Sequence, residues 1–311
     1  MKNSSGKVLF IIISFFLLAG GRPDSPDDYI ISREKGKIIL AYKAFGDFLD
    51  SDKSWESYRS IVLDPYPAIR KVHQRQIEWG DLDTTLFPDQ VRNYKKEDFA
   101  HFMDRYTQDD IDYLYDSIIE RSHRILAPVH KKEVDLCFFL PYGGGCFVIP
   151  EDSLNTIYIS MYIDPAEAEK IMAHEYAHIL HIDRRPKEPL TLRREIVSEG
   201  MAVFLTTMIL RDIEVSDAIP FMPPGSFAWC LENEQAIKDS IRLELNDTTM
   251  RLFKRYISDG SWAEPPAGFV QKKGYFAGYR IIEACIRKGM LPEEICSLSA
   301  DEVILKSGYF Q

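Results

Sequence analysis

Residues 174–178, HEYAH, combine two histidines four positions apart with a glutamate directly after the first. Four positions along a helix are just over one turn, so His174 and His178 would share one helix face. Two imidazoles on one face can bind a zinc ion at about 2.0–2.1 Å. Glu175 would lie beside the ion, where a carboxylate can act as general base towards a bound water. The motif therefore predicts a metal site with Glu175 as its catalytic base.

The residues that flank this motif carry almost no charge. They include Ile171, Met172, Ala173, Tyr176, Ala177, Ile179 and Leu180. Three ionisable side chains on such an apolar helix need a partner, and a metal ion is one. The alternative interpretation is a core helix in which hydrogen bonds satisfy both histidines and Glu175 is paired.

A catalytic zinc site needs a third protein ligand and one open position for water. A histidine six residues after His178 would complete a longer motif, but position 184 is arginine. The following apolar segment offers Glu195 and Glu199, which also share a helix face. Twenty residues lie between His178 and Glu199, enough for a turn and a returning helix.

We predict Glu199 as the third ligand. It directly precedes the apolar stretch GMAVF, where a carboxylate needs a partner, and Gly200 permits close helix packing. Glu195 lies nearer an arginine-rich end and is the alternative ligand. If Glu199 binds the metal, Glu195 could instead hold a ligand histidine by its other nitrogen. A salt bridge from Glu195 to Arg193 or Arg194, or plain solvent exposure, is an equally valid interpretation.

The helices that would carry these residues have clear start signals. Asp164 suits an N-cap, Pro165 the first helical position, and Glu167 would complete a capping box. We expect this helix to run from Pro165 to about Ile182. A second helix follows the N-cap Thr191.

Short β-like runs precede the first of these helices. Residues 134–140 and 146–149 flank PYGGG, which we interpret as a turn because the Gly-Lys-Ser/Thr of a phosphate loop is absent. Residues 155–163, NTIYISMYI, alternate apolar and polar side chains, which is typical of a half-buried strand.

The helical spacing of residues 29–126 and of the C-terminal third predicts helices, a small sheet, then helices again. The fold class is therefore α+β and mainly helical, with a small mixed sheet. We divide the chain into an export signal (1–21), a polar linker (22–28), a helical N-terminal region (29–126) and the domain with the HExxH helix (127–311).

The N-terminus has the three parts of an export signal: Lys2 and Lys7, an apolar run, and small residues up to Gly21. Gly21 stands where a bacterial lipoprotein would carry its lipid-bearing cysteine. A buried N-terminal helix is the alternative. We expect an exported protein of the periplasm, the cell envelope or the medium, with membrane association only through this segment.

Composition and charge limit the classes of partner. The 311 residues are 45% hydrophobic, which is enough for a packed core, and the net charge is −10. No basic run is present, so we expect no nucleic-acid partner. Five cysteines with no CxxC spacing leave buried free thiols and a disulfide both open.

HEYAH followed by SEGMA resembles the glutamate-zincin metallopeptidases, whose third ligand is a glutamate. More narrowly, the segments GGGCFV, NTIYISMYI, HEYAHILH, EIVSEGMAVF and YFAGYRII resemble the predicted zinc-dependent proteases of the domain of unknown function 2268, over roughly residues 130–290. The resemblance implies a zincin fold, one zinc ion per chain and peptide hydrolysis. Thermolysin-like relatives have an acid four residues after the third ligand, but here that residue is Val203. The partner that orients the histidines must therefore come from elsewhere.

Further roles can be assigned, one from this resemblance and the others from the residues themselves. Zincins bind an extended substrate along an edge strand, and residues 155–163 would fit that role. Tyr275 and Tyr279 share a helix face, and we slightly favour Tyr279 as the donor to the oxyanion, although either tyrosine could simply pack. His181 could support the site, or lie at a helix C-terminus where a partial positive charge is favourable.

The sequence therefore favours an exported zinc metallopeptidase that acts on a peptide or protein. The alternatives are a non-catalytic envelope binding or assembly protein on a zincin scaffold, and a zinc hydrolase of a non-peptide amide. Cleavage preference, endo- or exopeptidase action and oligomeric state are not predicted.

Overall fold

The computed structural model describes residues 25–79, 82–142, 146–151, 153–249, 255–257 and 272–311. The predicted signal and the glycine run 143–145 lie outside these residues. The strands are β1 (Ile30–Arg33), β2 (Gly36–Leu40), β3 (Glu133–Phe139), β4 (Cys146–Pro150) and β5 (Leu154–Ser160).

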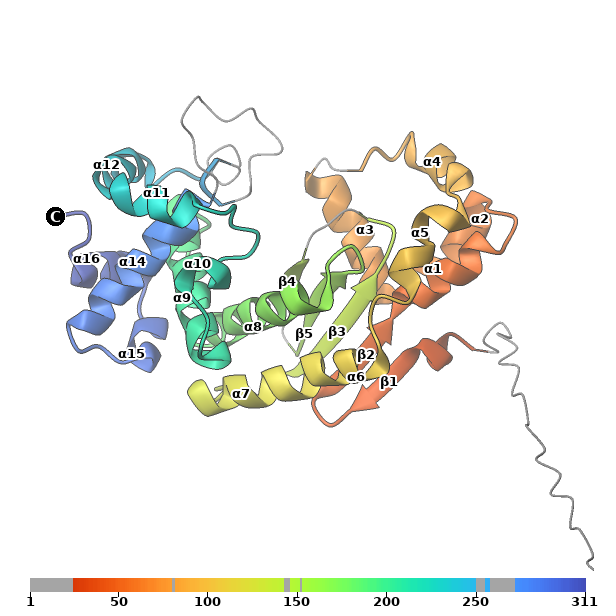
Figure 1. Cartoon of the computed structure of the whole chain (residues 1–311), viewed down its shortest axis with the longest axis horizontal. Coiled ribbons are helices and arrows are strands. Elements are labelled where there is room, and N and C mark those ends of the chain that lie inside the picture. Colours follow the sequence, from red (N-terminus) through yellow and green to blue (C-terminus); the bar gives the residue numbers. More distant parts are fainter. Residues whose placement is uncertain (1–24, 80–81, 143–145, 152, 250–254, 258–271) are drawn as a thin grey trace, which may run out of the picture.

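Helices surround this sheet in two groups (Figure 1). Between β2 and β3 lie α1 (Ala41–Leu49), α2 (Trp55–Tyr58), α3 (Pro67–Trp79), α4 (Phe87–Asn93), α5 (Lys96–Met103), α6 (Gln108–Asp112) and α7 (Ile118–Ile125). The same region contains the π-helical turns η2 (Arg59–Leu63) and η3 (Tyr113–Ser117). A short 3-10 turn, η1 (Pro26–Tyr29), precedes β1. After β5 come α8 (Pro165–Ile182), α9 (Leu192–Leu210), α10 (Val215–Ala218), α11 (Ser226–Glu232), α12 (Glu234–Glu244), α14 (Lys273–Arg287), α15 (Pro292–Cys296) and α16 (Ala300–Ser307).

The five strands form one mixed sheet in the order β1-β2-β3-β5-β4. The pairs β2–β3 and β3–β5 are parallel, whereas β1–β2 and β4–β5 are antiparallel. A mainly helical α+β fold with a small mixed sheet is therefore confirmed. The predicted division of the chain after residue 126 stays a prediction, although the sheet takes strands from both sides of that residue.

One expectation for the N-terminal region was wrong. Residues 30–40 were predicted to be helical but form the β1–β2 hairpin, and the first α-helix begins only at Ala41. Ile38, Ile39 and Leu40 pair with β3 and are buried. A short apolar run fits a buried strand as well as a helix, and only the long-range pairing with β3 decides between them.

The strand before α8 also differs from its prediction. β5 is buried along nearly its whole length, including its polar Asn155, Thr156 and Ser160, and β3 and β4 flank it on either side. It is therefore neither half-buried nor an edge. β4 forms the edge of the sheet, and its residues are largely half-buried.

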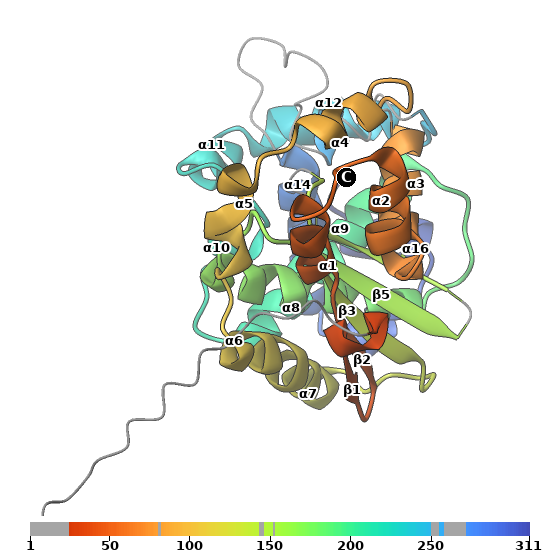
Figure 2. The same ribbon diagram turned by 90° about the vertical axis from the view of Figure 1, so that its right-hand side faces the viewer.

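Three long helices connect the sheet to the C-terminal part. α8 packs against β4 and β5, α9 packs on α8, and α14 packs on α9 (Figure 1). α7 lies beside α8 (Figure 2). Within the described residues, no helix has the length and apolar character needed to cross a membrane.

Two glycines allow α9 and α14 to touch backbone to backbone. A Cβ at Gly200 would lie 2.0 Å from the carbonyl carbon of Gly278, and a Cβ at Gly278 would lie 2.1 Å from the carbonyl oxygen of Ile196. Such distances are closer than any side chain permits, so the crossing requires glycine at both positions. The close packing expected of Gly200 is therefore confirmed.

We predict that Gly200→Ala lowers the free energy of unfolding by about 2 kcal/mol or more, since the new methyl group must push two backbones apart. Gly46→Ala in α1 is the matched control. Its Cβ would meet only Met103, at 3.6 Å and 3.7 Å. There alanine should stabilise the helix by about 0.5–1 kcal/mol. Urea unfolding of both variants tests this, and equal midpoints would contradict the tight crossing.

Candidate metal centre

The helix that carries the motif runs from Pro165 to Ile182, as predicted. The Asp164 carboxylate accepts a hydrogen bond from the Glu167 N–H at 3.0 Å, which satisfies one of the free donors at the helix start. Glu167 was predicted to complete a capping box, but its carboxylate pairs with Lys170 instead. The N-cap alone therefore fixes where α8 begins.

The three motif residues are buried in the interior of α8. The exposed fractions are 1% for His174 and 8% for both Glu175 and His178. The rings of the two histidines meet edge to face, with centroids 4.7 Å apart. Burial of three ionisable groups on one helix calls for a compensating partner within the fold.

For the two histidines that partner is Glu199, which α9 brings back to α8. Thr191 caps α9 through the Arg194 N–H, as predicted, and α9 then runs from Leu192 to Leu210. Glu199 is 8% exposed and lies at the close crossing of α9 with α14. The structure therefore brings the three predicted ligands together in what we call the His–His–Glu cluster (His174, His178 and Glu199).

The donor atoms of this cluster form a nearly equilateral triangle. The Nε2 atoms of the two histidines are 3.1 Å apart, and Glu199 Oε2 lies 3.1 Å from His174 Nε2 and 3.3 Å from His178 Nε2. Ligands bound tetrahedrally to zinc at its usual bond lengths are separated by about 3.3 Å. Size, donor types and burial thus fit a zinc ion, with one tetrahedral position left for water or substrate.

The electrostatics of the cluster follow from burial and from Glu199. Burial lowers the pKa of His174 to about 4, against the opposing effect of Glu199. For His178, burial also lowers the pKa, but Glu199 and Glu175 outweigh it and raise the value to about 9. The two histidines hold the pKa of the Glu199 carboxyl well below its ordinary range despite burial. Glu199 is therefore ionised and ready to bind a cation.

Glu175 is in a different environment from Glu199. Burial raises the pKa of its carboxyl to about 7, and His178 and the Val148 N–H oppose this rise. A carboxyl with a pKa near neutrality can both accept and donate a proton. Val148 belongs to the edge strand β4, so the carboxylate also marks where that edge meets the cluster.

Glu195 does not join the cluster. Its carboxylate pairs with the Arg194 guanidinium at 2.8 Å. The salt bridge considered from the sequence is therefore present. The Nδ1 atom of His178 instead lies 3.4 Å from the Ser198 hydroxyl. Sequence reasoning missed Ser198, although a small polar residue directly before a ligand in an apolar helix is a usable signal.

The first histidine lacks the orienting acid of thermolysin-like enzymes. His174 Nδ1 is buried and has no hydrogen-bond partner among the described residues. Val203, where those enzymes have an acid, is fully buried. The ring of Tyr275 lies 5.8 Å from that of His174. Packing therefore holds this ring in place.

Of the two tyrosines, the structure places Tyr275 at the cluster. Tyr275 is 9% exposed, and burial together with Glu199 raises its pKa well above 10. Tyr279, which the sequence slightly favoured, packs against the apolar group of Val203, Ala218, Ile219 and Tyr275, and its charged neighbours are Glu283, Arg280 and Arg287. Tyr275 therefore lies at the cluster, beside His174 and Glu199, and Tyr279 lies in a different environment.

His181 lies in the last turn of α8, at the helix C-terminus as predicted. It is 3% exposed, and burial with the charge of Arg185 lowers its pKa to about 3. Burial therefore favours the neutral imidazole, although the helix C-terminus would favour the charged form.

One further residue near the cluster had no sequence signal. Lys272, which precedes α14, is 6% exposed, and its Nζ lies 4.9 Å from the centroid of the Tyr275 ring. A lysine beside a second lysine looks like a solvent-exposed pair, so only the fold reveals its burial.

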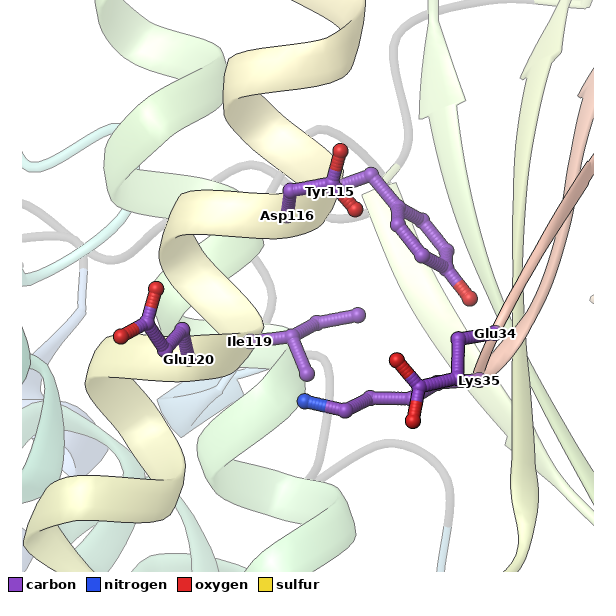
Figure 3. Close-up of a pocket in the computed structure, with 6 residues that line it drawn as sticks. All are labelled: Glu34, Lys35, Tyr115, Asp116, Ile119 and Glu120. Carbon is purple, nitrogen blue, oxygen red and sulfur yellow. The ribbon is translucent and has the colours of Figure 1, made fainter.

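A cavity of about 270 Å³ lies elsewhere, between the β1–β2 turn and the segment of η3 and α7. Figure 3 shows Lys35 extending from the turn towards the helix that carries Ile119 and Glu120. None of the residues lining it belongs to the His–His–Glu cluster. The cavity is therefore separate from the His–His–Glu cluster on α8 and α9. The cavity is lined by Glu34, Lys35, Tyr115, Asp116, Ile119 and Glu120.

Comparison with known proteins agrees with this placement. The profile of a family described as "Predicted Zn-dependent protease (DUF2268)" matches residues 142–305, just over half of the chain. The match contains α8, α9 and α14, and therefore every residue of the His–His–Glu cluster. No curated protein and no solved structure matches.

We predict that Glu199→Gln weakens zinc binding by more than about 100-fold, because it removes the ionised ligand and leaves its shape. Glu195→Gln, on the same helix but paired with Arg194, should change zinc affinity by less than about tenfold. Titration against a competing chromophoric chelator measures both. A larger loss in Glu195→Gln would instead assign the third ligand to Glu195.

Proposed function

This chain belongs to the family of predicted zinc-dependent proteases, and from that membership we propose that it is a zinc metallopeptidase whose active site is the His–His–Glu cluster. The observation that carries the proposal is the convergence of three buried donor atoms at zinc-like separations, next to the buried Glu175. A purely structural zinc site would fill all four positions with protein ligands and would have no use for Glu175.

One zinc ion per chain, bound by His174, His178 and Glu199, would supply a Lewis acid and a water of lowered pKa. Glu175 follows a ligand directly and can reach that water. Its carboxylate accepts the proton of the water and later delivers it to the leaving amine. The burial that raises its pKa to about 7 suits both steps.

The substrate is a peptide, as the family implies, and we place it along the outer edge of β4. An antiparallel edge strand offers unpaired backbone groups to an extended chain, which then adds as a further strand. The interaction of the Val148 N–H with Glu175 supports this position, because it brings the edge to the base. β5 cannot serve, since β3 and β4 already occupy both its sides.

We assign the hydroxyl that assists the oxyanion to Tyr275. Burial keeps its phenol protonated, so it is a hydrogen-bond donor at every working pH. Its side-chain hydrogen bond with Glu199 supports this assignment, because it brings the hydroxyl close to the cluster. The arrangement of edge strand, α8 and returning α9 is what a zincin would have, and we include that relationship in the proposal.

Export is a separate part of the proposal and depends on residues 1–21 alone. Their charged start, apolar run and small residues would direct the chain to the periplasm, the cell envelope or the medium.

We predict that Glu175→Gln lowers kcat by about 10²–10⁴-fold, because it removes the general base and keeps the shape of the side chain. Zinc content should stay at one per chain, since the amide replaces no ligand. Cleavage of a broad peptide library and metal analysis of the same samples measure both. Undiminished cleavage by Glu175→Gln would refute the mechanism, and a zinc-loaded wild-type protein that cleaves no peptide would refute the function.

We predict that Tyr275→Phe lowers kcat by about 100-fold with little change in KM, as expected for an interaction made mainly in the transition state. Tyr279→Phe should leave kcat within about twofold, because its hydroxyl belongs to another environment. Steady-state kinetics on one cleaved peptide compares the two variants. A large loss in Tyr279→Phe alone would return the role to Tyr279.

A further inference from the structure

Two consecutive residues of α9 contact the two ring nitrogens of His178. Glu199 Oε2 lies 3.3 Å from Nε2, and the Ser198 hydroxyl oxygen lies 3.4 Å from Nδ1. Ser198 is buried, so its hydroxyl is closed off from bulk water. α9 therefore holds this ring at both nitrogens. His174 contacts Glu199 through Nε2, and its Nδ1 has no hydrogen-bond partner among the described residues.

The contact made by the Ser198 hydroxyl is unusual for a buried helix residue of this chain. The other buried hydroxyls of the described helices donate to a carbonyl of their own helix: Ser122 to Ile118, Thr206 to Ala202 and Ser307 to Ile304, each at 2.7 Å. Such local bonds are a common way to satisfy a hydroxyl within a helix. Ser198 contacts a side chain of α8 instead. Its contact therefore supports the ring of His178 and not the backbone of α9.

The chemistry of imidazole gives this contact a direction. A metal-binding imidazole is neutral, so one ring nitrogen carries a proton and the other offers a lone pair. Nε2 of His178 faces the cluster and must keep its lone pair if a cation is to bind there. The proton is then on Nδ1, where the described part of the chain provides the Ser198 hydroxyl as partner. The hydroxyl oxygen is therefore the acceptor.

We propose that Ser198 is a positioning residue of the metal centre: its hydroxyl accepts the Nδ1 proton of His178 and so directs the lone pair of Nε2 towards the cation. This inference rests on the proposed function of the His–His–Glu cluster as a zinc site and identifies the support of its second histidine. A hydroxyl is neutral, so it orients the ring without adding negative charge to the centre. Removing such a partner typically weakens metal binding by about 10–100-fold, and a neutral partner should lie at the lower end of that range.

The first test compares zinc affinity in matched variants. Ser198→Ala should weaken zinc binding by about tenfold, measured by competition with a chromophoric chelator. Ser198→Thr keeps a hydroxyl and should retain the wild-type affinity within about threefold. Thr206→Val is the control, because it also removes a buried hydroxyl from α9, but one that bonds to its own helix. It should leave the affinity unchanged.

A second measurement follows the proton itself. In zinc-loaded protein with isotope-labelled histidine, two-bond proton–nitrogen NMR spectra show which ring nitrogen is protonated. We expect His178 to carry its proton on Nδ1, and Ser198→Ala to make that proton exchange with water about tenfold faster. Exchange at His174 should not change, since its Nδ1 has no partner to lose among the described residues. A general loosening of the fold would instead accelerate exchange at both rings.

The outcomes separate this inference from the proposed function. Equal zinc affinity in Ser198→Ala and the wild type, or an equal loss in Thr206→Val, would overturn the role of Ser198. A loss in Ser198→Thr as large as in Ser198→Ala, or faster exchange at both histidines, would also overturn it. A wild-type protein that binds zinc but cleaves no peptide, together with weaker zinc binding by Ser198→Ala, would support Ser198 and refute the peptidase.

Discussion

The interaction on which the centre depends is the burial of one ionised carboxylate, Glu199, between two imidazoles. An isolated carboxylate at 8% exposure would have a raised pKa and would tend to be neutral. An isolated buried histidine would have a lowered pKa, and its ring nitrogens would lack hydrogen-bond partners. Together the three groups satisfy one another at 3.1–3.3 Å, which is also the spacing of ligands around zinc. The fold thus holds the donors in place before any metal arrives, so binding need not order them.

The surrounding helices and strands position the cluster through successive packing contacts. The sheet supports α8, which carries both histidines and Glu175, and α8 supports α9, which carries Glu199. α14 comes close only because Gly200 and Gly278 remove every side-chain atom from the crossing. That contact lies one residue from Glu199 and three from Tyr275, so one backbone approach sets the position of a ligand and of its aromatic neighbour.

The parts that could be predicted from the sequence are those with local causes. Asp164 and Thr191 cap their helices through the N–H groups of Glu167 and Arg194, so the starts of α8 and α9 follow from adjacent residues. The strand order does not follow from adjacent residues. β4 lies at the edge of the sheet, outside β5, because of pairing between segments that no local sequence pattern connects. The alternation in residues 155–163 suggested a half-buried strand. Its polar side chains are in fact buried too, which requires the neighbouring strands and helices. The choice between Tyr275 and Tyr279 likewise depends on the rotation of α14 at its glycine crossing.

The missing acid at position 203 changes how the first ligand is held. In a centre with that acid, a hydrogen bond at Nδ1 orients the ring and makes it more basic. Here His174 has no such partner among the described residues, and the rings of His178 and Tyr275 fix it by contact. An imidazole without this hydrogen bond donates less electron density to a metal. A cation bound here would therefore keep more of its positive charge. Within the part of the chain that the structure describes, Nδ1 of His178 contacts the hydroxyl of Ser198, a weaker partner than a carboxylate. In the proposed peptidase, Glu175, whose pKa burial raises to about 7, would accept the proton that a water at the open position releases.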